Sequence, residues 1–267
     1  MVDTICVSYT YTFKCSVMEK IMMKGRIENR SMPAELGLSF LMSLLQNKSL
    51  RFQELATSVC SLAKNHIGES FAHLKSLICE FFHSTDYSAR AFEVSMHSFC
   101  QALYEMGMLG DLEVVPISQM RSANKKHGNV GDIELMENNV IIEAWDAKYG
   151  KPYLRDELEE LRDKLILYPD VRVAGFVADS IVDMRRDIET RKNEIEIETE
   201  TSICLFTFEE WVNSKSASLT SVQKEELAYR WLVALAESFA QKRPEQAPID
   251  EPCDGWVTDL IRVLEAI

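Results

Sequence analysis

The chain has 267 residues, of which 46% are hydrophobic, so it is long enough to bury one large core or two modest ones, and this composition excludes a fibrous or disordered protein. Its net charge of −13 argues against a protein that coats nucleic acid, because Lys and Arg contacts with phosphate supply most non-specific affinity. Any DNA-binding role has to overcome this charge.

Two further features indicate the compartment. The sequence has no run of about 18 apolar residues that would span a bilayer, and its N-terminus alternates polar and apolar residues instead of resembling a signal peptide. The seven cysteines are odd in number and scattered, which favours reduced thiols over a disulfide framework. We therefore expect a cytoplasmic protein that does not bind a membrane.

Residues 1–85 are expected to form a helical N-terminal subregion. After Pro33, leucines and phenylalanines recur at three- and four-residue steps, which is the period of an amphipathic helix. A further helix is predicted to begin at Ser84 or Asp86, because either side chain can cap it, and to end near Gly107.

Beyond this helix the hydrophobic period becomes that of extended chain. Short runs rich in β-branched or apolar residues predict strands at 112–117, 130–135 and 140–148. The last two strands are expected to form a hairpin, because the turn-forming segment 137–139 separates them.

The remaining elements alternate between helices and strands. In chain order, we expect a charged helix at 153–168, a buried strand at 171–178, a helix capped by Asp179 or Ser180, a strand at 203–208, a short helix from Glu209 and a long helix at 221–242. The capped helix is expected to dissolve into the Glu-rich stretch 194–200, and the tail around 244–252 is expected to be loose. This order predicts an α/β fold with a mixed central sheet flanked by helices.

The same pattern suggests how the chain is organised. We divide it into the helical subregion at 1–85, a core at 86–215, and a C-terminal helix with an acidic tail at 216–267. No repeat and no clean linker separates these parts, so a single compact domain is expected.

Two carboxylates and a lysine lie on the predicted hairpin. Side chains alternate along a strand, so Asp146 and Lys148 point to one face, and the preceding strand brings Asp132 toward Asp146. Two such carboxylates can share a Mg²⁺ ion, to which the carbonyl of Ala147 adds a further oxygen ligand. We therefore predict that Asp132 and Asp146 hold the metal, while Lys148 orients or deprotonates a water for phosphodiester hydrolysis.

The segments G-D-I-E-L and N-V-I-I-E-A-W-D-A-K-Y-G-K resemble the two-part motif of the PD-(D/E)xK nuclease superfamily. Asp132 matches the first aspartate, Asp146 the variable acid and Lys148 the lysine, whereas Gly131 replaces the proline often found before the first aspartate. The resemblance implies a restriction-endonuclease-like core that cuts double-stranded DNA with Mg²⁺. It also implies a homodimer, because a palindrome suits two-fold symmetry, and a DNA methyltransferase gene nearby.

Three other acids near the motif differ in whether they can take part in the metal site. Glu93 lies on the helix before the hairpin, where several restriction enzymes have a glutamate that faces the metal site; its alternative is an ion pair with Arg90. Glu134 shares the face of Asp132 and can assist the site, whereas Glu143 lies on the face opposite Asp146.

Basic and polar residues flank the motif on both sides. The DNA-contact candidates are Arg121, Asn124, Lys125 and Lys126 in the preceding loop, and Lys151, Tyr153 and Arg155 after the second strand. Arginine suits guanine and phosphate, and asparagine suits adenine. The alternative is that these segments are ordinary solvated loops.

Two further alternatives stay open. Cys79, His83, His97 and Cys100 have the spacing of two zinc ligands on each of two helices, although their apolar neighbours favour core packing. The protein as a whole is either a type II-like restriction enzyme, a repair, recombination or mobile-element nuclease with the same core, or a non-catalytic acidic interaction protein in which Asp146 and Lys148 form an ordinary ion pair.

Overall fold

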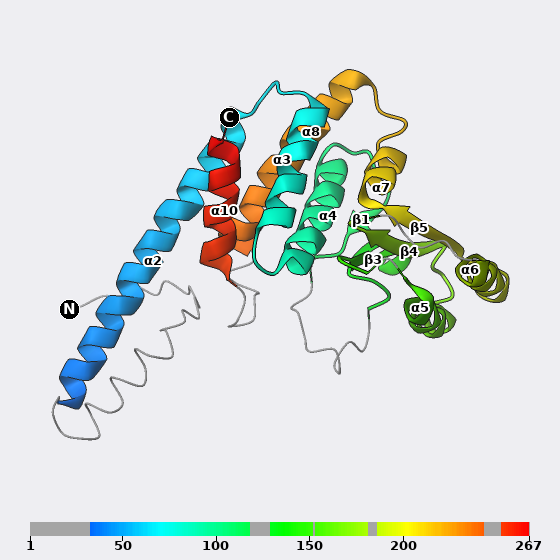
Figure 1. Ribbon diagram of the computed structural model, residues 1–267, viewed down its shortest axis with the longest axis horizontal. Helices are drawn as coiled ribbons and strands as arrows, with labels where there is room; N and C mark the ends of the chain where they lie inside the picture. The colour runs from blue at the N-terminus through cyan, green and yellow to red at the C-terminus, as the bar shows by residue number, and fades with distance from the viewer. Residues whose placement is uncertain (1–32, 118–128, 152, 181–185, 243–251, 267) are drawn as a thin grey trace.

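A mixed five-stranded sheet lies between two sets of helices in the computed structural model (Figure 1). The structure describes residues 33–117, 129–151, 153–180, 186–242 and 252–266. The α/β class expected from the sequence is confirmed, with helices on both faces of the sheet.

The five strands lie side by side in chain order. They are β1 (Glu113–Val114), β2 (Ile133–Glu137), β3 (Val140–Lys148), β4 (Val173–Ala178) and β5 (Ser202–Thr207). The first three pair antiparallel, and β3, β4 and β5 pair parallel. Every predicted strand is present, but the first two differ most in their bounds. The first is shorter than the predicted 112–117, although Ile117 is buried, and the second runs from Ile133 to Glu137 instead of 130–135.

The β2–β3 hairpin forms where it was predicted because of its turn. Asn138 and Asn139 have φ angles of 52° and 65°, a left-handed conformation that asparagine tolerates better than most residues. The turn sets the register, in which Ile133 lies opposite Trp145. A shift between Leu135 and Met136 then bends β2.

Two helical layers cover the sheet (Figure 1). The larger layer contains α2 (Ala34–Asn65), α3 (Phe71–Ser84), α4 (Ser88–Glu105), α8 (Ser221–Glu237) with its π-helical end η2 (Ser238–Lys242), and α10 (Cys253–Glu265). The helices α5 (Arg155–Leu167) and α6 (Arg186–Thr199) pack on each other beside the other face, and α7 (Phe208–Lys215) follows β5. No helix in these described segments is long and apolar enough to cross a membrane.

The helices from both ends of the chain share one core with α4. The indole of Trp231 on α8 donates to the carbonyl of Ser95 on α4 at 2.8 Å, and that of Trp256 on α10 donates to the carbonyl of Asp86 at 2.8 Å. All three of these helices contribute to the same buried cluster, which reaches the sheet at Trp145. The described residues of the predicted subregions at 1–85 and 216–267 therefore pack together on one side of the sheet.

Two details differ from the sequence expectations. The first residue before α4 is Tyr87, which has a φ of 58° and makes no side-chain capping bond, so capping by Ser84 or Asp86 was wrong. Helix α6 does not dissolve at its acidic end but continues to Thr199. Residues 181–185, which separate the predicted cap at Asp179 or Ser180 from the first residue of α6, lie outside the described residues, as does 243–251, most of the predicted loose tail.

Helix α10 was not anticipated, because the C-terminus was interpreted as an acidic tail. Its buried residues are Trp256, Val257, Leu260, Val263 and Leu264. Their three- and four-residue spacing is visible in the sequence and marks one apolar face of a helix.

Candidate active site

Asp132 and Asp146 occupy facing positions at the open end of the hairpin. The register pairs Ile133 with Trp145, so one step further along the ladder Asp132 comes opposite Asp146. The Oδ2 of Asp132 accepts a hydrogen bond from the backbone N–H of Ala147 at 3.1 Å. The first aspartate is thus tied to β3 beside the second.

Asp146 and Lys148 share one face of β3, as the alternation predicted. The Nζ of Lys148 lies 3.2 Å from Oδ2 of Asp146, and both side chains are largely buried. The same Nζ lies 5.4 Å from the ring centroid of Phe176, which belongs to the cluster beneath α5 and α6. The pair therefore lies on the α5 side of the sheet.

Asp146 has an unsatisfied oxygen. Its Oδ1 is buried and has no hydrogen-bond partner among the described residues. Buried polar atoms are nearly always satisfied, so this carboxylate oxygen is costly to bury unless a cation or a water binds it.

Glu134 brings a third carboxylate to the same face. Its Oε1 accepts from the backbone N–H of Val130 at 2.5 Å and from that of Gly131 at 3.3 Å. Burial raises the pKa of Glu134, the two N–H groups and Lys164 oppose that rise, and the charge of Asp146 adds to it. Glu134 therefore lies on the same face as Asp146, bound to the backbone that precedes Asp132.

Gly131 is required by a close backbone approach. A Cβ at this position would lie 2.8 Å from the carbonyl oxygen and 2.9 Å from the nitrogen of Trp145. Real Cβ atoms do not come so near, so only glycine fits without moving the strand. The residue that replaces the motif's usual proline therefore has a steric reason in this chain.

Glu93 is paired as its alternative interpretation predicted. Its Oε1 accepts from the guanidinium of Arg90, and both side chains are buried. Helix α4 packs against the face of the sheet that presents Trp145, whereas Asp146 faces α5. A metal-site role for Glu93 therefore stays a prediction.

Glu143 points away from the site, as expected. It accepts hydrogen bonds from the indole of Trp145 and from the ammonium of Lys215 on α7. The same ammonium lies 5.2 Å from the centroid of the Trp145 ring. Glu143 is therefore bound on the side of the hairpin that faces α7, and it takes no part in the cluster around Asp146.

Lys164 was not singled out from the sequence. It lies on α5, and its Nζ donates to the carbonyl of Val130 at 2.9 Å. The available signal was its position between the buried Leu161 and Leu165 on the inner side of an otherwise charged helix.

The DNA-contact candidates after β3 are all held by acids. Lys151 lies 3.2 Å from Glu157, and the hydroxyl of Tyr153 donates to Asp187 at 3.0 Å. The earlier candidates Arg121, Asn124, Lys125 and Lys126 lie outside the described residues.

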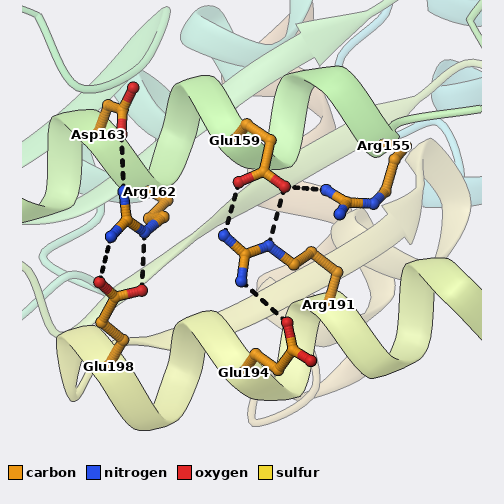
Figure 2. Close-up of polar contacts among 7 residues, drawn as sticks. All are labelled: Arg155, Glu159, Arg162, Asp163, Arg191, Glu194 and Glu198. Atoms are coloured by element: carbon orange, nitrogen blue, oxygen red, sulfur yellow. Dashed lines mark hydrogen bonds and ion pairs between the residues drawn. The ribbon is translucent and has the colours of Figure 1, made fainter.

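Arg155 belongs to a larger ion-pair network between α5 and α6 (Figure 2). It donates to Glu159, which also accepts from Nη2 of Arg191 at 2.6 Å and from its Nε at 2.9 Å. Hydrogen bonds from Arg191 and then Arg155 lower the pKa of Glu159 to about 2. One carboxylate therefore binds two arginines, of which Arg155 was a candidate for DNA contact.

The two histidines among the four candidate zinc ligands make other contacts. His83 lies 3.1 Å from the hydroxyl of Tyr149, and Nε2 of His97 lies 3.0 Å from the carbonyl of Val115. Burial raises the pKa of Cys79 to about 11 and that of Cys100 to about 12, which disfavours the thiolate that binds metal. Within the described segments no three His, Cys, Asp or Glu side chains gather around one point.

Comparison with known proteins adds no relative. No protein-family model matches the chain, and no curated protein matches its sequence. The residues and their geometry therefore carry the functional assignment.

Proposed function

We propose that this protein is a Mg²⁺-dependent endonuclease with a restriction-endonuclease-like core that hydrolyses phosphodiester bonds in double-stranded DNA. The observation that supports this most is the cluster at the end of the hairpin. Asp132 is bonded to the backbone beside Asp146, and Lys148 lies 3.2 Å from Asp146 on its own face. The helix, antiparallel strands, helix and parallel strand that surround the cluster have the order that the motif resemblance implies.

The donor set suits Mg²⁺. The site offers hard oxygen donors from Asp132, Asp146 and the Ala147 carbonyl. The buried Oδ1 of Asp146 has no hydrogen bond, within the described residues, that would compete with a cation. Magnesium usually takes one or two carboxylates and completes its shell with water and substrate phosphate, so a larger protein cage is not needed. The absence of a group of three ligating side chains in the described residues is compatible with this mode of binding.

The three side chains of the cluster would have different roles in hydrolysis. Asp132 and Asp146 bind the cation, which when bound polarises the phosphoryl oxygen and lowers the pKa of a coordinated water. Lys148 keeps a positive charge at the same face, where it orients the attacking water and offsets charge that develops on phosphate. Asp146 positions that ammonium through the 3.2 Å contact.

Two observations favour a non-catalytic alternative. The chain has a net charge of −13, and Lys151 and Arg155 beside the site are each paired with an acid. An acidic interaction protein with an incidental Asp146–Lys148 pair would have these properties. A repair or mobile-element nuclease with the same core is a further alternative, and it differs from a restriction enzyme in the DNA it selects.

Incubation of the purified chain with unmethylated plasmid is expected to give discrete fragments with Mg²⁺ and none with EDTA. The two metal conditions test the requirement for a divalent cation. Random products, or a preference for branched or single-stranded DNA, would indicate the repair or mobile-element alternative. No cleavage with Mg²⁺ or Mn²⁺ across varied DNA would overturn the nuclease proposal. A methyltransferase gene beside this one would favour restriction, and a dimer in solution would fit a palindromic target.

The substitution Glu159→Gln is expected to strengthen DNA binding. It releases Arg155 and Arg191 from a shared carboxylate, and each new phosphate contact steepens the dependence of log K on log salt by about 0.9. Fluorescence anisotropy with a DNA duplex in EDTA, repeated over a salt series, measures both quantities. Glu189→Gln, which removes an exposed acid from α6, the helix that carries Arg191, controls for net charge. Equal binding by the two variants would contradict this role of Arg155.

A further inference from the structure

We propose that Glu134 and Lys164 are positioning residues that clamp the turn before β2 and so hold Asp132 against the backbone of β3 beside Asp146. The catalytic meaning of this clamp rests on the proposed nuclease function. Its geometry is independent of that function and can be tested separately.

The clamp binds both backbone polar groups of Val130, its N–H and its carbonyl oxygen. The carboxylate of Glu134 accepts the N–H of Val130 at 2.5 Å, and the ammonium of Lys164 donates to the carbonyl of Val130 at 2.9 Å. The N–H of Gly131 also points to Glu134, at 3.3 Å. Two side chains from different elements therefore satisfy a buried stretch of backbone that is not part of a strand.

Packing leaves this turn little room to move. The side chain of Val130 is fully buried in the cluster beneath α5, and Gly131 lies directly against the backbone of Trp145. Asp132 is the next residue, and its Oδ2 reaches the N–H of Ala147 at 3.1 Å. Because the turn is fixed on both sides, the direction of the Asp132 side chain is fixed as well.

Glu134 and Glu143 form a matched pair for a test. Both are buried acids on the β2–β3 hairpin, and each is close to a lysine from a neighbouring helix. Glu134 lies on the face of Asp146, whereas Glu143 lies on the opposite face. Removing either acid perturbs the hairpin, but only the loss of Glu134 should free Asp132.

Hydrogen exchange at the Ala147 amide tests the clamp directly, because that N–H donates to Asp132. With the full chain studied by NMR, Glu134→Ala and Lys164→Met are each expected to speed exchange at Ala147 by about tenfold or more relative to the amides of β4. Glu143→Ala should leave this ratio within about threefold of wild type. Glu134→Gln should preserve protection, since its amide oxygen still accepts from Val130 and Gly131.

Cleavage assays give the second readout. Glu134→Ala is expected to lower the single-turnover rate by about a hundredfold with little change in the Kd for DNA, and Glu134→Gln should recover most of the rate. Unchanged Ala147 exchange in both Glu134→Ala and Lys164→Met would overturn the clamp, as would equal loss of protection in the alanine and glutamine variants. If wild type cuts no DNA, the nuclease proposal fails, while the exchange ratios still decide whether Glu134 and Lys164 position Asp132.

Discussion

Replacement of Asp146 by asparagine is expected to lower the rate of DNA cleavage by about a thousandfold or more. The neutral amide is a poor ligand for Mg²⁺, and it removes the negative charge that holds Lys148 at 3.2 Å. Single-turnover cleavage of plasmid at saturating enzyme measures the rate without a contribution from product release. Direct Mn²⁺ binding to the protein alone, followed by electron paramagnetic resonance, should weaken in parallel.

The same substitution is not expected to damage the fold. Asparagine has nearly the same shape, and the buried Oδ1 of Asp146 makes no hydrogen bond within the described residues that would be lost. We therefore expect the free energy of unfolding in urea to stay within about 1 kcal/mol of wild type, or to rise, since active sites often sacrifice stability. Asp163→Asn, at an exposed acid on α5, should retain full cleavage. Loss of activity in both variants, or in neither, would contradict a metal role for Asp146.

The hairpin could be predicted from the sequence because its determinants are local. Alternation places Asp146 and Lys148 on one face, and the Asn138–Asn139 turn sets the length of the connection. These two features depend only on neighbouring residues. The structure confirms the bounds 140–148 without change.

The surroundings of the site could not be predicted in the same way, because they depend on how α5 and α6 pack. The sequence made Arg155 a candidate for DNA contact, but Arg191, from the next helix along the chain, completes a network around Glu159 that engages both arginines (Figure 2). Lys164 meets Val130 across a separation of 34 residues. Ion pairs and hydrogen bonds of this kind decide which arginine and lysine side chains are available to contact a phosphate.

The same packing explains the misjudged acidic end of α6. The charge density at 194–200 suggested a solvated stretch in which the helix would fail. In the structure Glu196 pairs with Lys192 at 2.9 Å and accepts from the backbone N–H of Ile203, while Glu198 pairs with Arg162 of α5. The Lys192–Glu196 pair lies within α6, but Ile203 belongs to β5 and Arg162 to α5, and local propensity does not contain those two contacts.

Gly175→Ala is expected to destabilise the protein by about 3 kcal/mol or more, the largest stability effect we predict. Gly175 lies on β4 between β3 and β5, and a Cβ there would fall 2.0 Å from the carbonyl oxygen of Cys204 and 2.8 Å from its carbonyl carbon. Both atoms belong to the backbone, so no side-chain rotation relieves the clash. The strands β4 and β5 would have to separate where their parallel ladder is continuous.

Gly255→Ala supplies the control for this prediction. In α10 the nearest atom to a new Cβ is Cβ of Pro252 at 3.6 Å, an ordinary contact. Alanine at a helical position lowers the entropy of the unfolded chain, so this variant should gain up to about 1 kcal/mol. Urea unfolding followed by circular dichroism measures both changes. If Gly175→Ala unfolds at the same urea concentration as wild type, Gly175 of β4 does not lie opposite Cys204 of β5. The arrangement of the parallel strands beside Asp146 would then be wrong.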